Sequence, residues 1–204
     1  MFYVAAYDIT DDRIRNKIAH YLEEYGKRVQ YSCFEIYSPY ENQIEIITLK
    51  IQEWIEKDDR VFFYPISKWA KKNIVYLPKK VKEVLREIKN EFPRAEKYQV
   101  KIMLNEEIYY QLTSNKRISR YLIVYDIHNN SIRKELSQIL ESYGIRVQLS
   151  VFEIDSKPIL IPHLINELIP YSYYGKINIY PLDYKSQKKT IRIGTPYQKL
   201  DFLI

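Results

Sequence analysis

The stretch YGKRVQYSCFEI, residues 25–36, returns nearly unchanged as YGIRVQLSVFEI, residues 143–154. The two stretches stand 118 positions apart, and the similarity extends upstream of both. Aligning residues 3–36 with residues 121–154 needs no gap and gives seventeen identical positions out of thirty-four. Chance does not produce this agreement, so the sequence indicates an internal duplication.

Each copy repeats one order of predicted elements. FYVAAYDI (2–9) and RYLIVYDI (120–127) are rich in β-branched and aromatic residues, which indicates strands. Apolar residues then recur at helical spacing, and the repeated stretch after this helix reads as one strand. A helix, a strand and a last short strand follow in each copy, at 43–57, 61–66 and 73–77 and at about 158–169, 177–182 and 190–194.

The order β-α-β-β-α-β is the ferredoxin-like plan, so we expect an α+β chain with two such units. Each unit should form a four-stranded antiparallel sheet with both helices on one face. Alternation along the repeated strand turns Val29, Tyr31 and Cys33 toward the helices and leaves Phe34 and Ile36 on the uncovered face. Because uncovered apolar residues need a partner, the two sheets should pack face to face as an intrachain pseudo-dimer.

The predicted organisation has three parts. Residues 1–77 form the first ferredoxin-like unit, residues 78–118 a structured connector, and residues 119–204 the second unit with a C-terminal tail. The connector begins with an amphipathic helical pattern, and the alternation of KYQVKIML (97–104) predicts a strand. The apolar tail after Gly194 either adds a strand to a neighbour's sheet or packs on its own fold.

Composition narrows the functional classes. The net charge of +6 favours an anionic partner such as nucleic acid, although a surface of the thermophilic type explains it equally well. The single cysteine, Cys33, excludes an intrachain disulfide, fits a reducing cytoplasm, and lies among apolar neighbours as a core residue would. No apolar run approaches the ~20 residues of a membrane helix, and no Gly-rich phosphate loop or zinc spacing is present.

The first strand of each copy ends in Tyr-Asp-Ile, with Asp8 and Asp126 at matching positions. Aspartate is unfavourable in strands. Neighbouring residues already supply helix caps, so a turn role and a functional role both stay open. In a pseudo-dimer the two carboxylates can share one Mg²⁺ or Mn²⁺, which prefers hard oxygen ligands and retains waters. Such an ion polarises a phosphodiester or activates a water.

Four arginines also recur at matching positions. Two stand in the first turn of a predicted helix and two open the polar side of the repeated strand: Arg15 and Arg133, and Arg28 and Arg146. Simple solvent exposure explains them, and a phosphate contact beside the aspartates is the functional alternative, slightly favoured by the basic charge. Glu35 and Glu153 are expected on the helix side, without an assigned role.

A strand ending in YDI, an Arg-bearing helix ending in YG, the RVQ-x-S-x-FE stretch and a YP strand resemble the CRISPR-associated Cas2 family. Both halves match, over about 1–77 and 119–194. Family members are normally one unit and form homodimers, so this chain resembles two fused units. The resemblance implies a metal-dependent endonuclease on RNA or duplex DNA, with Asp8 and Asp126 as catalytic and metal-binding residues. It also implies a scaffold that bridges integrase subunits and prespacer DNA during spacer acquisition.

Three functions stay open from the sequence. In the first, Asp8 and Asp126 hold Mg²⁺ and the protein cuts phosphodiesters. In the second, basic surfaces bind a DNA duplex, the tail docks an integrase, and the aspartates are inherited structure. The third is a toxin-type ribonuclease of the same fold. Asn129 and Asn130 stand where the first copy has aspartates, which implies an asymmetric site; the substrate and any further oligomerisation of the chain stay open.

Overall fold

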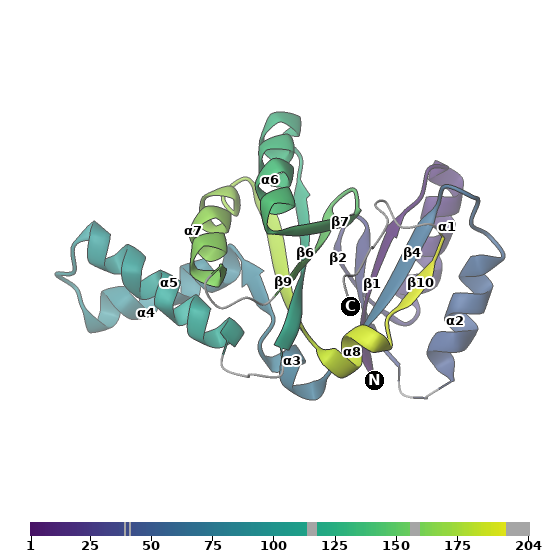
Figure 1. Cartoon of the computed structure of the whole chain (residues 1–204), viewed down its shortest axis with the longest axis horizontal. Helices are drawn as coiled ribbons and strands as arrows, with labels where there is room; N and C mark the ends of the chain where they lie inside the picture. The colour runs from purple at the N-terminus through teal and green to yellow at the C-terminus, as the bar shows by residue number, and fades with distance from the viewer. Residues whose placement is uncertain (39, 41, 114–117, 156–159, 195–204) are drawn as a thin grey trace.

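Two five-stranded antiparallel sheets face each other, and helices cover their outer sides (Figure 1). The computed structural model describes residues 1–38, 40, 42–113, 118–155 and 160–194. The first half consists of β1 (Phe2–Asp8), α1 (Asp12–Glu23), β2 (Gly26–Gln30), β3 (Cys33–Tyr37), α2 (Gln43–Gln52), β4 (Arg60–Ile66), α3 (Lys68–Lys72) and β5 (Val75–Leu77). The second half consists of β6 (Ile118–Ile127), α6 (Asn130–Tyr143), β7 (Gly144–Gln148), β8 (Val151–Asp155), α7 (Ile161–Tyr171), β9 (Gly175–Asp183), α8 (Tyr184–Lys188) and β10 (Ile191–Ile193).

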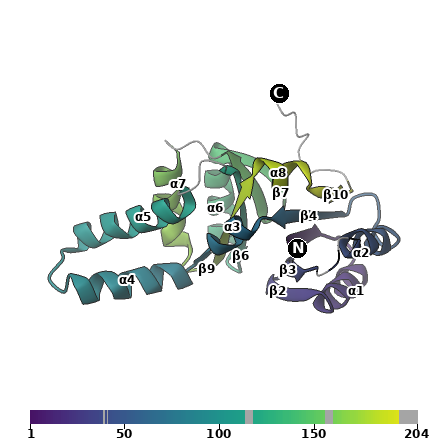
Figure 2. The same ribbon diagram turned by 90° about the horizontal axis from the view of Figure 1, so that it is seen from below.

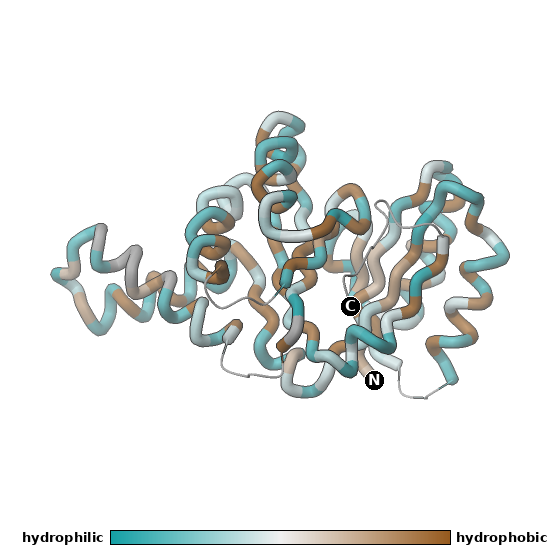
Figure 3. Tube along the Cα trace, viewed as in Figure 1, coloured by the Kyte–Doolittle hydropathy of each residue, from teal (hydrophilic) through white to brown (hydrophobic). Residues whose placement is uncertain are grey.

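The α+β fold of two ferredoxin-like units packed as an intrachain pseudo-dimer is confirmed. The strand orders are β10-β4-β1-β3-β2 and β5-β9-β6-β8-β7. Helices α1 and α2 lie outside the first sheet, and α6 and α7 lie outside the second (Figure 1). Apolar and polar residues alternate along these helices, as expected of elements with one buried side (Figure 3).

Side-chain caps fix where the first helix of each half begins. The Asp11 carboxylate accepts hydrogen bonds from the backbone N–H groups of Arg13 and Ile14 at the start of α1. Asn129 accepts from the backbone N–H of Ile132 in the same way at the start of α6. These contacts satisfy N–H groups that have no partner within a helix. The expected caps are therefore present in both halves, and neither aspartate of the Tyr-Asp-Ile motif is needed for capping.

The prediction of one strand over the repeated stretch is wrong. In the first half it is a hairpin, β2 and β3, joined by a turn at Tyr31 and Ser32. The second half has the same hairpin, β7 and β8, with its turn at Leu149 and Ser150. The pairing of each hairpin also shifts register just before the turn. A turn and a register shift both break simple alternation, because alternation holds only within one regular strand.

The predicted faces of this stretch are consequently reversed. Phe34 and Ile36 pack with Ile18 and Leu22 of α1 in the outer core of the first half. The other face carries Cys33, which lies in a cluster between the sheets. That inter-sheet cluster contains Phe2, Val4, Ala6, Cys33, Phe62, Tyr64, Ile66, Ala70, Ile74, Leu122, Val124, Val147, Val151, Tyr180 and Leu182. The sheets do pack face to face, but through the opposite set of side chains.

The shortest strands are exchanged between the halves. Each was expected in the sheet of its own copy, as part of a four-stranded sheet. Instead β5 pairs with β9 of the second half, and β10 pairs with β4 of the first half. The edge strand beside β4 or β9 therefore comes from the other half. Each sheet has five strands and not four, because the repeated stretch supplies two strands in place of one.

The connector forms a helical hairpin, α4 (Lys79–Glu91) and α5 (Lys97–Thr113). The predicted strand at 97–104 is wrong, because those residues open α5, whose seventeen residues include the alternating stretch. The hairpin projects from the second half, beside α7 (Figure 2). Val84 and Ile88 of α4 and Ile108 of α5 belong to the outer core of that half, so the hairpin is anchored by apolar burial.

Gly26 and Gly144 begin β2 and β7 at points of close backbone approach. A Cβ atom at Gly26 would collide with the carbonyl oxygen of Glu35, and one at Gly144 would collide with that of Glu153. Only a residue without a side chain fits so close to the neighbouring strand. The repeated glycines are thus explained by the tight pairing within each hairpin.

Glu35 and Glu153 lie between the sheets, not on the helix side as expected. Glu35 accepts hydrogen bonds from the hydroxyls of Tyr76 (2.6 Å) and Tyr180 (3.2 Å). The equivalent Glu153 accepts from the hydroxyl of Tyr64 at 3.0 Å, and it also forms ion pairs with two arginines, Arg120 (2.9 Å) and Arg192 (2.8 Å). Both carboxylates are buried, so these contacts replace the water that solvates an exposed carboxylate.

Two other sequence expectations concern burial and the tail. Cys33 is fully buried, as expected, and burial raises the pKa of its thiol. None of the helices in the described residues is long and apolar enough to cross a membrane. The tail after Gly194, for which a docking or packing role was expected, lies outside the described residues.

Candidate functional site

Asp8 and Asp126 reach the inter-sheet seam because of their place in the strands. Val4 and Ala6 of β1 face the second sheet, and alternation turns Asp8 toward the same side. Val124 of β6 belongs to the same inter-sheet cluster, so Asp126 follows it at the equivalent position. Two aspartates distant in sequence therefore come from opposite sheets to one edge of the pseudo-dimer.

Both aspartates line one cleft of about 660 Å³. Three of the four predicted arginines, Arg15, Arg133 and Arg146, line it as well, whereas Arg28 is not among its lining residues. The first half supplies Tyr7, Asp8, Ile9, Arg15, Gln30, Tyr31 and Ser32, and the second supplies Val124, Tyr125, Asp126, Ile127, His128, Arg133, Arg146, Gln148, Leu149, Ser150 and Val151. The structure thus brings most of the predicted site residues together, while their roles stay predictions.

The two halves hold each other's aspartates through crossed contacts. The backbone N–H of Tyr31, in the turn of the first half, donates to Oδ2 of Asp126 at 3.4 Å. The backbone N–H of Leu149, in the turn of the second half, donates to Asp8. Because each contact crosses the seam, the position of either carboxylate depends on both halves.

The electrostatic setting of Asp8 has two opposing parts. Burial raises the pKa of Asp8 above its ordinary value of 3.8, because a buried carboxylate loses hydration. The guanidinium of Arg60, 3.6 Å from Oδ2, acts in the opposite direction and lowers that pKa. The effect of burial is the larger one, so Asp8 binds a proton more readily than an exposed aspartate does. A further cation beside Asp8 would stabilise the charged carboxylate.

The arginines at the cleft are held differently in the two halves. Arg15 donates to the carbonyl oxygens of Ile9 (3.2 Å) and Thr10 (3.3 Å) and forms an ion pair with Asp12. Its equivalent Arg133 donates to the side-chain oxygen of Asn130 at 2.6 Å. Arg15 is thus fixed in place by these three neighbours and by the hydroxyl of Tyr31, to which its Nη1 donates at 3.0 Å.

The hairpin arginines are held by their own turns. Arg28 donates from Nε to the carbonyl oxygen of Tyr31 at 3.1 Å. Arg146 donates from Nη2 to the carbonyl oxygen of Leu149 at 2.9 Å and lies 3.6 Å from the carboxylate of Glu141. The turns therefore carry positive charge next to the cleft, which suits an anionic ligand.

Gln30 and Gln148 are cleft residues that the sequence analysis did not single out. Nε2 of Gln30 donates to the carbonyl oxygen of Val124 at 2.9 Å, and Nε2 of Gln148 donates to that of Ala6 at 3.0 Å. Both side chains are buried, and neither amide oxygen has a hydrogen-bond partner. The donor contact fixes which end of each amide is oxygen. The identity of both residues in the repeat was the signal that could have identified them.

Two tyrosines of the Tyr-Asp-Ile motif hold the turns at the cleft. The hydroxyl of Tyr7 donates to the carbonyl oxygen of Tyr31, and that of Tyr125 donates to the carbonyl oxygen of Leu149, each at 3.1 Å. Burial raises the pKa of Tyr7 to about 12. Both hydroxyls therefore stay protonated at neutral pH and act as donors. His128 also lines the cleft, and Thr10 stands at its matching position in the first half.

The cleft fits a hard divalent cation such as Mg²⁺ in the chemistry of its oxygen atoms. Asp8 and Asp126 offer carboxylates, and the same cleft is lined by Gln30 and Gln148, whose buried amide oxygens have no hydrogen-bond partner. Within the described residues no group of three or more His, Cys, Asp or Glu is placed to bind a metal. A two-carboxylate site with retained waters suits Mg²⁺, and the part of the chain that the structure describes adds no third His, Cys, Asp or Glu to such a site.

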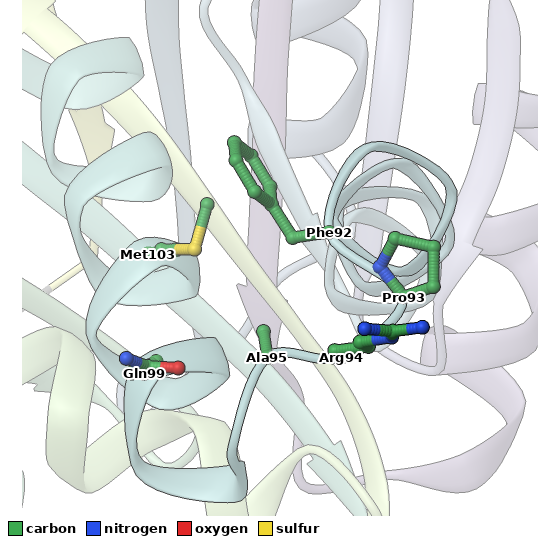
Figure 4. A pocket seen from close by; sticks show the side chains of 6 residues that line it. All are labelled: Phe92, Pro93, Arg94, Ala95, Gln99 and Met103. Atoms are coloured by element: carbon green, nitrogen blue, oxygen red, sulfur yellow. The ribbon is translucent and has the colours of Figure 1, made fainter.

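A second hollow, of about 670 Å³, lies at the tip of the connector hairpin (Figure 4). Phe92 of the loop faces Met103 of α5 across it, and Pro93 and Ala95 of the loop also line it. Arg94 and Gln99 complete the lining. None of the predicted site residues belongs to this hollow, so the seam cleft is the candidate functional site.

The fold and the cleft define an α+β protein in which two ferredoxin-like halves share one seam site with paired aspartates and basic side chains. The family model described as "CRISPR associated protein Cas2" matches residues 1–74 and 119–190. The chain belongs to this family, and it carries two copies of the family unit. The connector hairpin lies outside both matched segments.

Individual relatives resemble part of the chain. The "CRISPR-associated endoribonuclease Cas2 3" of Synechocystis sp. is 46% identical over 67 residues, which are 32% of this chain and 71% of that protein. The "CRISPR-associated endoribonuclease Cas2 4" of Rhodospirillum rubrum is 35% identical over 85 residues, 40% of this chain and 68% of that protein. The "CRISPR-associated endonuclease Cas2 2" of Thermus thermophilus is 38% identical over 66 residues, 32% of this chain and 72% of that protein.

Proposed function

We propose that this protein is a metal-dependent endonuclease of CRISPR spacer acquisition that cuts phosphodiesters of RNA or duplex DNA in the seam cleft. The observation that carries the proposal is the convergence of Asp8 and Asp126 on one cleft that also contains basic side chains from both halves. The names of the relatives, two endoribonucleases and one endonuclease, support phosphodiester cleavage.

Each group in the cleft has a physical task in this proposal. Asp8 and Asp126 would hold Mg²⁺ or Mn²⁺, which supplies polarisation of the phosphodiester and a more acidic water. Arg15 and Arg133 would orient the phosphates on either side, and Arg146 adds positive charge. The turn hydrogen bonds described above keep the carboxylates in place across the seam. We expect cleavage to fall as the pH drops through the raised pKa of Asp8, because the carboxylate then becomes protonated.

The test compares cleavage of end-labelled RNA and duplex DNA in Mg²⁺, in Mn²⁺ and in EDTA, with binding scored on the same gels. Asp8→Asn and Asp126→Asn should each lower the cleavage rate by about a hundredfold or more while the protein still binds. Asp11→Asn is the matched control, because Asn129 occupies that capping position in the second half. Cleavage that persists in EDTA, or in both site variants, would contradict the proposal.

An adaptor without cleavage is the second candidate, and the contact between Asp8 and Arg60 favours it. A protein cation already lies 3.6 Å from this carboxylate, which lessens its need for a metal ion. In this case the protein bridges an integrase subunit and prespacer DNA through its basic surface. Duplex binding should then be metal-independent, fall steeply with salt, and be unchanged in Asp8→Asn and Asp126→Asn. Unmeasurable duplex affinity at low salt would exclude the adaptor.

A further inference from the structure

The two turns at the cleft differ in one exposed side chain. Tyr31 stands at the tip of the first hairpin and Leu149 at the matching tip of the second. Both line the cleft, and both are more than half exposed, at 56% and 53%. The flanking residues Gln30 and Ser32 are identical in the second half, so the difference is confined to the side chain that reaches the cleft.

The ring of Tyr31 is held in place by two cations. Nη1 of Arg15 donates to the Tyr31 hydroxyl at 3.0 Å. The guanidinium of Arg28 lies over the ring, 5.1 Å from its centroid. The guanidinium of Arg15 also lies over the ring, 5.8 Å from its centroid. An exposed aromatic ring normally moves freely, whereas this one is held by two guanidinium groups while more than half of the residue stays open. A fixed, open ring loses little entropy when a flat ligand stacks on it.

Tyr31 is also next to the paired aspartates. Its backbone N–H donates to Asp126, and its carbonyl oxygen accepts from Tyr7, the residue before Asp8. A base stacked on this ring would therefore belong to a nucleotide close to the phosphodiester that faces the carboxylates. Leu149 occupies the equivalent position beside Asp8, but it offers no aromatic face.

We infer that Tyr31 is a stacking platform for one unpaired nucleobase of a single-stranded nucleic acid in the cleft, and that the second half has no such platform. This inference rests on the proposed function only in taking the cleft as a nucleic-acid site. Aromatic stacking suits any unpaired base, whereas a base inside a duplex is already stacked on its neighbours. Because only one of two related turns has the ring, the cleft binds a single strand in one preferred orientation.

The test uses the full chain in EDTA, so that binding is read without cleavage. The probes are single-stranded RNA and single-stranded DNA of about eight nucleotides, each with 2-aminopurine at one position, and a duplex DNA of the same sequence. Stacking of 2-aminopurine on an aromatic ring quenches its fluorescence. Moving the probe base along the strand should give one position of maximal quenching in the wild type.

The variants separate stacking from a purely structural role. Tyr31→Leu copies the second half, whose matching turn already accommodates leucine, and should lose the quenching and weaken single-strand binding by about fivefold to tenfold. Tyr31→Phe removes the hydroxyl that Arg15 contacts but keeps the ring, and should retain the quenching. Leu149→Tyr should add a second position of quenching. Tyr173 is somewhat more exposed than Tyr31 and does not line the cleft, so Tyr173→Leu should change nothing.

Quenching with the RNA probe, with the DNA probe or with both supports the platform, and it shows which kind of single strand the platform binds. Wild-type quenching and affinity in Tyr31→Leu, or loss of both in Tyr31→Phe, would overturn it. Failure of the nuclease proposal is distinguishable, because cleavage can be absent while the quenching remains. Equally, a cleaving enzyme with unchanged quenching in Tyr31→Leu would leave the nuclease proposal in place and remove the platform.

Discussion

Glu35 and Glu153 occupy matching positions of β3 and β8, yet their buried surroundings differ. Tyrosine hydroxyls surround Glu35, whereas Glu153 contacts Arg120 and Arg192 in addition to a tyrosine. The difference arises from two replacements: Arg192 of β10 stands where the first half has Tyr76 of β5, and Arg120 of β6 stands where the first half has Phe2 of β1. In a homodimer of identical units both sites would change together. In a fused chain each half can change alone, so the two sides of one interface can acquire different chemistry.

The largest expected loss of stability comes from replacing Glu153, and comparing it with the replacement of Glu35 tests the difference between the two sites. Glu153→Gln removes the buried charge that Arg120 and Arg192 share. Arg120 keeps its ion pair with Asp155, whereas Arg192 loses its ion pair with Glu153, so the free energy of unfolding should fall by about 3 kcal/mol. Glu35→Gln keeps an oxygen that can accept from the tyrosine hydroxyls, and should cost no more than about 1 kcal/mol. Urea unfolding of both variants checks this. Equal costs would mean that the arginines add nothing to the site of Glu153.

A middle-sized effect should be equal in the two halves. Gln30→Leu and Gln148→Leu each remove one buried hydrogen bond across the seam, to the carbonyl oxygens of Val124 and Ala6. Each change should lower the free energy of unfolding by about 1–2 kcal/mol. Urea unfolding measures both. If one variant costs more than twice as much as the other, the halves differ even where their contacts look alike.

The smallest effect concerns the pH dependence of stability at Asp8. Because its pKa is raised, stability from the protonated carboxyl is complete below pH 3.8 and is lost as the pH rises through the raised value. Asparagine does not ionise, so Asp8→Asn does not lose stability as the pH rises. The variant should therefore melt a few degrees higher than the wild type at neutral pH, at most. The gain should vanish as the pH falls toward 3.8. Melting temperatures of the variant and the wild type, measured from about pH 3.5 to about pH 7.5 in steps of about 0.5 pH unit, check this prediction.

Asp11 provides the control of opposite sign for the pH experiment. The backbone N–H groups of Ile14 and Arg13 lower the pKa of Asp11. Its contribution to stability is therefore present above pH 3.8 and is lost as the pH falls through the lowered value. Asp11→Asn should give no gain at neutral pH. A gain of the same size in both variants would show that the effect at Asp8 comes from net charge and not from burial.

The duplication, the ferredoxin-like units, the face-to-face packing and the meeting of Asp8 with Asp126 could all be predicted from the sequence. An ungapped repeat carries such information, because two similar units with apolar sheet faces have few ways to bury these faces. The reversed faces could not be predicted, since the turns at Tyr31-Ser32 and Leu149-Ser150 lack the Gly or Asn that usually marks a two-residue hairpin turn.

Two other errors have different physical causes. The window at 97–104 is short enough to fit both strand and helix periods, and only the continuation to Thr113 shows the longer element. The exchange of β5 and β10 leaves no mark in local periodicity, because a three-residue strand can add to either sheet. At the cleft, the aspartates and arginines could be selected from the sequence because they are charged. Gln30 and Tyr31 could not, because their contacts with Val124 and Asp126 cross from one half to the other and are visible only in the structure.

The exchanged strands also bear on how the chain is made. While the ribosome is still synthesising the second half, the sheet of β1 to β4 has an open edge beside β4, and it stays open until β10 emerges at residues 191–193. β5 emerges early but has no sheet to join until β9 exists. Neither half can complete its hydrogen bonding alone: the second sheet can close once β9 exists, whereas the first sheet closes only after β10 has emerged. A nascent chain halted before β10 would present the unpaired edge of β4 to other proteins.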